Sequence, residues 1–296
     1  MNSENSRIHC QVTDIQCVWN AASWRISFAP DRPERGFFVV FQPHVGQAAA
    51  EHGGHVVISR ILRKSQGRLE PGFLLEEFFP TADGRCLARF RHATEESLHL
   101  SVVVTVSLET ASSSDLNCER GNIPQRQQLA VLEGVLLMRT EAGETRPGVV
   151  LLDEIDALST ELLGKIHVQV EDLRNAAIPL LPRKVVFGGK EGEIAFDIVS
   201  WRLPENTWLL RWVHPLDGLP LDTRELSQLQ IDPAVRTVGG STPEVCGYEI
   251  LPGGIEKGVT FAARCIYIMG EGVIPKDVVK RRLQQFLFSQ PPLSDG

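Results

Sequence analysis

Residues Cys246 to Ser289 read CGYEILPGGIEKGVTFAARCIYIMGEGVIPKDVVKRRLQQFLFS, and this stretch decides the fold. From Val259 to Met269 successive side chains point to opposite sides of an extended chain, and both sides are mostly apolar. A strand of this kind is covered on both faces, or has a core on one face and a cavity on the other. The stretch therefore predicts a central strand in a layered, β-rich protein.

A helix is expected after this strand. Gly270 and Gly272 end the strand, and Pro275 suits the first helical position because its missing N–H and fixed φ cost nothing there. Apolar side chains then recur at helical spacing, at Val278, Val279, Leu283, Phe286 and Leu287. Their stripe must lie on an apolar surface, which we expect to be the preceding sheet.

Composition and charge exclude several classes of protein. The chain has 296 residues, of which 43% are hydrophobic and 23% charged, so it can bury one large core or two ordinary ones. A net charge of -7 argues against broad attraction to nucleic acid or an anionic bilayer. No apolar run is long enough to span a bilayer, and the first ten residues lack the apolar core of a signal peptide. We therefore expect no nucleic-acid partner and no transmembrane segment.

The six cysteines indicate the compartment. They form no CxxC pair, and the chain contains no N-x-S/T sequon, so a reduced, cytoplasmic environment fits best. A disulfide between distant cysteines stays open, because spacing alone does not exclude it.

Residues 1–110 are expected to form an N-terminal antiparallel β module. Apolar runs are found at Gly36–Gln42, His55–Leu62, Phe73–Phe79, Arg85–Phe90 and Leu98–Leu108. A short helical segment at Gln47–Glu51 is the one helical feature of this part. Residues 111–128 are polar and contain Gly121 and Pro124, which predicts a linker.

Residues 129–296 are expected to form a second, α+β domain. Glu193–Trp201 and Thr207–Val213 flank a Pro-Glu-Asn turn and predict a hairpin. Short helices are predicted at Ser159–Leu163 and near Thr223–Leu229.

The order of these elements resembles the C-terminal half of START domains, in the wider Bet v 1-like, helix-grip group of lipid-binding folds. The resemblance covers about Pro182 to Phe288 and rests on the motifs RWVHPLDGLP, CGYEILP, the Val-Thr-Phe strand and Gly-x-Ile-Pro-Lys. It implies a curved antiparallel sheet that wraps the last helix and leaves a hydrophobic tunnel. The region before Pro182 lacks the early helices of that family.

Two motifs that suggest catalysis or metal binding lack their partners. Val149–Leu158 (VVLLDEIDAL) resembles a Walker B strand with Asp153 and Glu154 at its end, but the chain has no phosphate-binding G-x-x-x-x-G-K-S/T loop. A buried strand with a polar end explains it better. His44, Glu51, His52 and His55 lie around Gly53 and Gly54, which favours a polar loop over a metal site. We predict no metal, no cofactor and no catalytic residues.

Six residues are candidates for ligand binding. Trp208 and Trp212 lie on one face of the predicted hairpin and are interpreted as core or as the wall of a cavity. Arg211, Arg264 and Asp197 are single charges in apolar strands, so each needs a partner or a wet cavity. A pair between Asp197 and either arginine is the structural interpretation, and a ligand headgroup on the arginine is the functional one. Tyr248, in the Gly-Tyr strand, completes the set.

The sequence thus predicts a β-rich α+β protein, with an antiparallel sheet that grips a C-terminal helix, preceded by an antiparallel β module. The expected function is non-catalytic binding of a lipid or other hydrophobic small molecule between that sheet and helix. The alternative is a structural or protein–protein interaction subunit, in which the N-terminal module or a partner chain covers the second apolar face.

Overall fold

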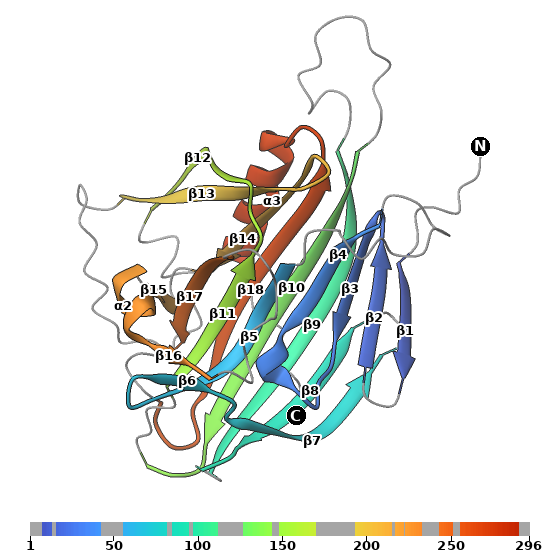
Figure 1. The fold of residues 1–296 in the computed structure, drawn as a ribbon. Coiled ribbons are helices and arrows are strands. Elements are labelled where there is room, and N and C mark those ends of the chain that lie inside the picture. The colour runs from blue at the N-terminus through green and yellow to red at the C-terminus, as the bar shows by residue number, and fades with distance from the viewer. Residues whose placement is uncertain are drawn as a thin grey trace, which may run out of the picture.

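The computed structural model shows a β-rich protein built from two antiparallel sheets, with two α-helices in the described residues (Figure 1). The prediction of a β-rich, antiparallel protein with a C-terminal helix is confirmed. The structure describes residues 8–13, 16–42, 56–81, 85–94, 97–111, 127–143, 148–169, 193–214, 217–221, 223–232, 243–250 and 255–289.

The first sheet, sheet A, has ten strands. Its main path in spatial order is β1 (His9–Thr13), β2 (Gln16–Ala21), β3 (Trp24–Phe28), β4 (Phe37–Phe41), β5 (Val56–Ser65), β11 (Val149–Ile155), β17 (Glu244–Ile250) and β15 (Gly218–Leu221). The short strand β6 (Arg68–Glu70) pairs with β5 and, in parallel, with β16 (Gln230–Ile231). A 3-10 turn, η2 (Pro33–Arg35), precedes β4.

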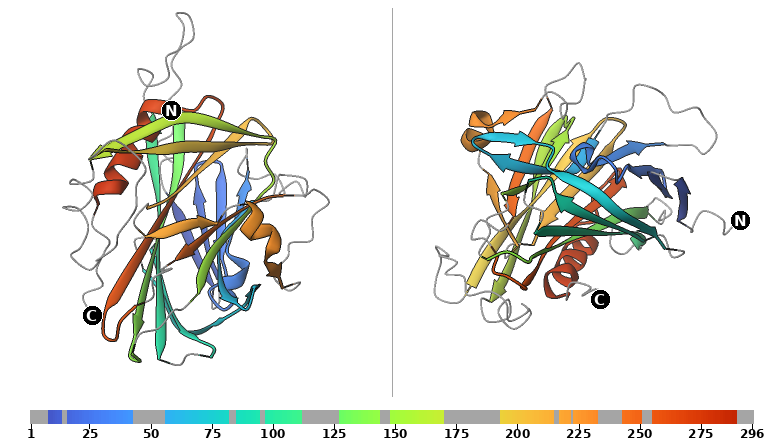
Figure 2. Two further views of the ribbon diagram at one scale, coloured as in Figure 1. Left: turned by 90° about the vertical axis from the view of Figure 1, so that its left-hand side faces the viewer. Right: turned by 90° about the horizontal axis from the view of Figure 1, so that it is seen from below.

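The second sheet, sheet B, has eight strands. Their spatial order is β12 (Ser159–Gln169), β13 (Glu193–Leu203), β14 (Thr207–Val213), β18 (Thr260–Glu271), β10 (Gln127–Thr140), β9 (Leu98–Ala111), β8 (Cys86–His92) and β7 (Phe73–Pro80). Strands β18, β10 and β9 are long and form its centre, and β12 and β13 run side by side at one end of the molecule (Figure 2).

The main core lies between the two sheets. Alternate side chains of β18, including Phe261, Tyr267 and Met269, pack there with side chains of sheet A such as Trp19 and Ile58. Alternation with period two places these residues on one face of each strand, as the sequence pattern predicts. Burial of this shared apolar face holds the sheets together.

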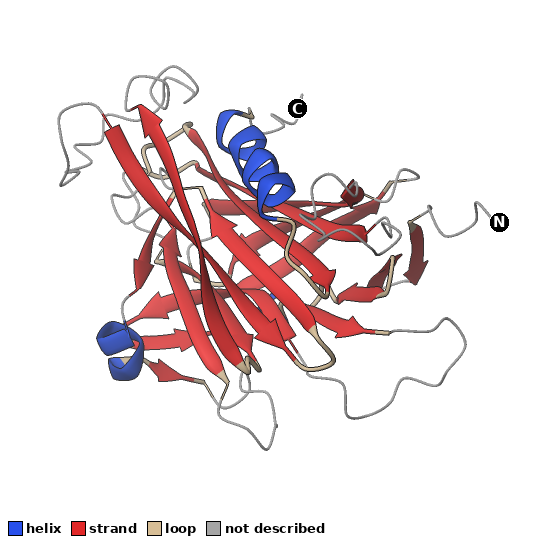
Figure 3. Cartoon of the chain, turned by 90° about the horizontal axis from the view of Figure 1, so that it is seen from above, coloured by secondary structure: helices blue, strands red, loops and turns tan. Residues whose placement is uncertain are grey.

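Helix α3 (Lys276–Phe288) covers part of the outer face of sheet B (Figure 3). Its buried residues, among them Val279, Leu283 and Phe286, form one cluster with Ile266 and Ile268 of β18. Near Ile266 and Ile268 both faces of β18 are therefore covered, one by sheet A and the other by the helix.

Most elements agree with the sequence prediction, and one does not. Helix α2 (Thr223–Gln228) is present where a short helix was expected. Ser159–Leu163, predicted as a helix, is strand: it forms the start of β12, and Ser159 to Leu162 pair with β13 before a bulge at Leu163. Cross-strand pairing outweighs the weak helix preference of these residues. The predicted helix at residues 47–51 and the histidine cluster lie outside the described residues.

Strands from residues 1–110 and from residues 129–296 occur in both sheets. β9 pairs with β10 in sheet B, and β5 pairs with β11 in sheet A. Most of the expected linker, residues 112–126, lies outside the described residues. Among the helices that are described, none has the length and apolar character needed to cross a bilayer.

Candidate functional site

The six predicted ligand-binding residues do not form one site. Arg211 and Tyr248 are in contact, whereas Trp208 and Trp212 belong to a separate apolar cluster. The Arg211 side chain points from β14 into the space between the sheets, where its guanidinium lies 4.5 Å from the ring centroid of Tyr248. The Trp201 ring lies on another side, at 5.8 Å. A guanidinium over aromatic rings gains a cation–π attraction, which is larger when water is excluded.

Arg211 is neutralised by Asp153, the residue that the Walker B motif had marked. Arg211 Nη1 donates to Asp153 Oδ2. The other carboxylate oxygen accepts from the Ser59 N–H at 2.7 Å and from the Tyr267 hydroxyl at 3.1 Å. The Ser59 and Tyr267 hydroxyls also lie 2.8 Å apart. Both oxygens of this fully buried carboxylate are therefore occupied.

The electrostatics of this buried network favour a charged ion pair beside a neutral tyrosine. Burial is the largest influence and lowers the pKa of Arg211, but Asp153, together with the nearby Tyr248, Tyr267 and Cys246, outweighs burial, so the pKa of Arg211 is raised. Burial, followed by the negative charge of Asp153, raises the pKa of Tyr267 well above its ordinary value. Ser59 is held at φ 51°, a left-handed conformation that costs energy for a residue with a side chain. These contacts give the network a structural role: they bind the strained residue of β5 to sheet B.

Trp208 and Trp212 lie on the opposite face of β14, beneath α3. Both belong to the apolar cluster that contains Leu283 and Phe286 of the helix. The Trp212 ring meets Phe196 edge-on at 5.9 Å between centroids. The thickness of the sheet therefore separates these tryptophans from Arg211.

Arg264 fixes the end of α3. Its Nε donates to Asp217 Oδ2 at 3.0 Å, and its Nη1 donates to the carbonyl of Ser289, just after the helix. His214 lies beside it, with Nε2 3.1 Å from the carbonyl of Leu287. Lys and Arg groups at a helix C-terminus satisfy its free carbonyls and oppose the negative end of the helix dipole.

Asp197 is exposed on β13 and lies 3.3 Å from Lys165 on β12. The expectation that Asp197 pairs with Arg211 or Arg264 is wrong. Arg211 pairs with Asp153, and Arg264 pairs with Asp217. Neither aspartate lies in the predicted hairpin, so the hairpin pattern did not indicate these pairs.

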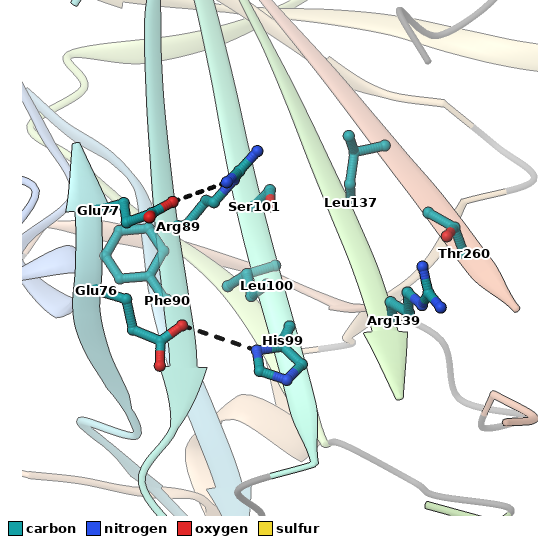
Figure 4. A pocket seen from close by; sticks show the side chains of 10 residues that line it. All are labelled: Glu76, Glu77, Arg89, Phe90, His99, Leu100, Ser101, Leu137, Arg139 and Thr260. Atoms are coloured by element: carbon teal, nitrogen blue, oxygen red, sulfur yellow. Dashed lines mark hydrogen bonds and ion pairs between the residues drawn. The ribbon is translucent and has the colours of Figure 1, made fainter. Parts of the chain in front are cut away.

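A groove lies on the outer face of sheet B, on the side that α3 covers elsewhere (Figure 4). Its volume is about 640 Å³. The lining residues come from β7, β8, β9, β10 and β18, and they are Glu76, Glu77, Arg89, Phe90, His99, Leu100, Ser101, Leu137, Arg139 and Thr260. Strand register places the groove beyond the C-terminal end of the helix: Arg264, which binds that end, pairs with Val135, and Thr260 pairs with Arg139 farther along.

The groove combines an apolar floor with polar walls. Leu137 is buried, and Ser101 pairs with it on the neighbouring strand. On the walls, Arg89 Nη1 lies 2.7 Å from Glu77 Oε2, and His99 Nδ1 lies 3.8 Å from Glu76 Oε2. Such a lining can hold an apolar body on the sheet while hydroxyl and guanidinium groups hold a polar end.

The sequence did not single out the groove residues. They come from five strands, and no local motif joins them. The one available signal was the polar side chains at alternate positions of β8 and β9, Arg89 and Arg91 on one strand and His99 and Ser101 on the other. Within the described residues, no three His, Cys, Asp or Glu side chains are grouped so as to hold a metal ion.

Comparison of the chain with known protein-family models and with curated proteins gives no match.

Proposed function

We propose that the protein is a non-catalytic binding protein for an apolar small molecule with a polar end, such as a fatty acid or another lipid. Sheet B and α3 act together as the helix-grip unit expected from the sequence. The ligand lies in the groove that continues the sheet surface past the end of the helix.

The groove is the observation that carries this proposal. Its volume is in the range of small-molecule sites, which is about 300 to 1,000 Å³. The buried Leu137 supplies apolar contact, Thr260 and Ser101 supply hydroxyls, and Arg139 supplies a positive charge at the open end. A carboxylate on the ligand would accept from Arg139, whose present ion-pair partner Glu141 is exposed and therefore weakly bound.

A site directly beneath α3 is the position that the sequence suggested. Trp208, Leu283 and Phe286 pack in one buried cluster there. A ligand in that position would have to separate these side chains and lose their burial, about 1.5 to 3 kcal/mol for each large apolar side chain. The groove requires no such separation, which favours it.

The test is a fluorescence titration of the purified full chain with cis-parinaric acid, a fluorescent fatty acid. Ser101→Phe fills the groove with a bulky side chain at a partly exposed position and should abolish or strongly weaken binding. Ser27→Phe makes the same change at a partly exposed position of β3 in sheet A and should bind like the parent protein. Equal binding by both variants would place the ligand elsewhere, and no binding by the parent protein would remove the proposal.

The alternative function, an interaction subunit, is favoured by one separate observation. β12 is an edge strand of sheet B, and among the described residues it pairs only with β13. Leu162 on this strand is 58% exposed, and Leu158 just before it is 72% exposed. Exposed leucines on an unpaired edge are typical of a surface that adds a further strand.

Light scattering with size-exclusion chromatography tests this alternative as self-association. Leu162→Glu should shift a concentration-dependent dimer to monomer, whereas Val273→Glu, at an exposed position in the connection between β18 and α3, should not. A strict monomer at high concentration would count against the alternative.

A further inference from the structure

Three basic side chains lie in a row at the end of the ligand groove. Arg91 of β8 pairs in register with His99 of β9, and His99 pairs with Arg139 of β10. Residues that pair across neighbouring strands share one face of the sheet, so the three side chains are lateral neighbours. Strands lie about 4.8 Å apart, so this basic row spans roughly 10 Å. His99 and Arg139 line the groove close to the ends of their strands (Figure 4).

The carboxylates beside the basic row neutralise it weakly. Glu76 is shared, with Oε1 3.5 Å from Arg91 Nε and Oε2 3.8 Å from His99 Nδ1. Glu141 Oε1 lies 2.9 Å from Arg139 Nε. All five side chains are at least 37% exposed, and exposed ion pairs contribute little to stability. Because positive charges on neighbouring strands repel one another, an anion placed on the basic row would relieve an unfavourable arrangement.

The same face of sheet B becomes apolar with distance from the basic row. Two residues farther along each strand the surface is mixed, with Arg89, Ser101 and Leu137 in register. Two residues beyond these, Leu87, Val103 and Val135 pair in register and form an apolar row. Val135 pairs on its other side with Arg264, which binds the end of α3. At about 3.3 Å per residue, roughly 13 Å separates the basic row from the apolar row.

We propose that the groove selects an anionic amphiphile, whose negative head group lies on the basic row and whose apolar chain runs along the strands toward the end of α3. This inference rests on the proposed binding function and adds the charge of the ligand and its direction. The guanidinium groups of Arg91 and Arg139 donate charge-assisted hydrogen bonds to the head group. A neutral lipid, such as a sterol or a glyceride, leaves the repulsion within the basic row in place and binds less tightly.

The opposite direction is unfavourable for physical reasons. It would place the negative head group on the apolar row, where an anion loses water without gaining a partner. The nearest cation there is Arg264, which is 7% exposed and already donates to Asp217 and to the carbonyl of Ser289. Its guanidinium is therefore committed to holding the end of the helix.

The experiment compares two fluorescent probes, cis-parinaric acid and its methyl ester, in titrations of the purified full chain. The probes share one apolar chain and differ in the negative charge of the head group. The parent protein should bind the acid several-fold more tightly than the ester. Arg139→Gln and Arg91→Gln should each weaken binding of the acid several-fold and leave binding of the ester unchanged. Arg25→Gln removes the same charge from an exposed position of β3 in sheet A and should preserve the difference between the probes.

The probes separate failure of this inference from failure of the proposed function. Equal binding of acid and ester, with both blocked by Ser101→Phe, would overturn recognition of the charge while the groove remained the binding site. No binding of either probe would overturn the binding function and this inference together. Equal losses in Arg139→Gln and Arg25→Gln would overturn the role of the basic row.

A further variant tests the direction of the ligand. Val103→Lys places a positive charge in the apolar row, at a partly exposed position. It should weaken binding of both probes, because the apolar chain would lie against a solvated ammonium group. Tighter binding of the acid by Val103→Lys would overturn the proposed direction, since it would place the head group at the apolar row.

Discussion

The two faces of β14 show two different ways of filling a protein interior. The face toward sheet A carries Arg211 within a closed polar network, and the face toward α3 carries Trp208 and Trp212 within apolar packing. On the first face the position of each group is fixed by directional bonds to charged or polar atoms. On the second face the fit of apolar shapes and their burial fix the positions of the side chains. The ion pair between Arg282 of the helix and Glu109 is partly exposed. The polar face therefore tolerates loss of a single partner less well than the apolar face does.

Replacement of Arg211 by Met should give the largest effect, a loss of about 3 to 5 kcal/mol in the free energy of unfolding, because it leaves the buried Asp153 charge unpaired. Urea denaturation measures the loss. Lys165→Met, which breaks the exposed pair with Asp197, is the control and should cost less than about 1 kcal/mol. The double variant Asp153→Leu with Arg211→Met should regain part of the loss. Equal costs for Arg211→Met and Lys165→Met would show that the polar network contributes little.

Leu283→Ala tests the apolar face. This side chain is fully buried between α3 and sheet B, so its truncation should cost about 2 to 4 kcal/mol. The same change at the exposed Leu162 should alter the free energy of unfolding by less than about 0.5 kcal/mol. A small effect at Leu283 would mean that α3 packs loosely on sheet B and that a ligand can enter between them.

Tyr267→Phe removes one hydrogen bond from Asp153 while the ion pair with Arg211 stays. The expected cost is about 1 to 2 kcal/mol, since the carboxylate oxygen keeps its bond from the Ser59 N–H. The same urea denaturation gives the value. A cost as large as that of Arg211→Met would indicate that the network collapses as a unit.

The smallest predicted effect is a dependence of stability on alkaline pH. The folded protein retains the Tyr267 proton above the ordinary tyrosine pKa of 10, whereas the unfolded chain releases it. Stability from this group is thus complete below pH 10 and falls as the pH rises further. In Tyr248→Phe, Tyr267 is the one remaining tyrosine of two. Absorbance at 295 nm should then show no phenolate near pH 10 until the protein unfolds, and an ordinary titration curve would contradict the buried hydrogen-bonded hydroxyl.

Local patterns were sufficient to predict much of the fold. Alternation located β18, the Pro-Glu-Asn turn located the hairpin of β13 and β14, and Pro275 with the following stripe located α3. They also placed Trp208 and Trp212 correctly on one face of β14. These features depend on residues that are close in the sequence, so their spacing contains the information.

The partners of the buried charges were not predictable in this way. Asp153 lies 58 residues from Arg211 and 94 residues from Ser59, and no periodic pattern connects them. The motif at Asp153 was correctly interpreted as a buried strand. The role of its carboxylate depends on partners from the other sheet, so the local pattern did not indicate it. The groove residues share the same difficulty, because strand order brings them into proximity.

The place of β18 within sheet B has a consequence for the synthesis of the protein. β18 lies between β14 and β10, although it follows both of them in the chain. Until residues 260–271 leave the ribosome, β10 and β14 have no common neighbour, and their apolar edges stay open. Sheets that are completed by pairing between strands far apart in the sequence fold slowly, and their intermediates are prone to aggregation. We therefore expect nascent chains that end before Thr260 to require chaperone protection, and the sheet to close only after β18 has been translated.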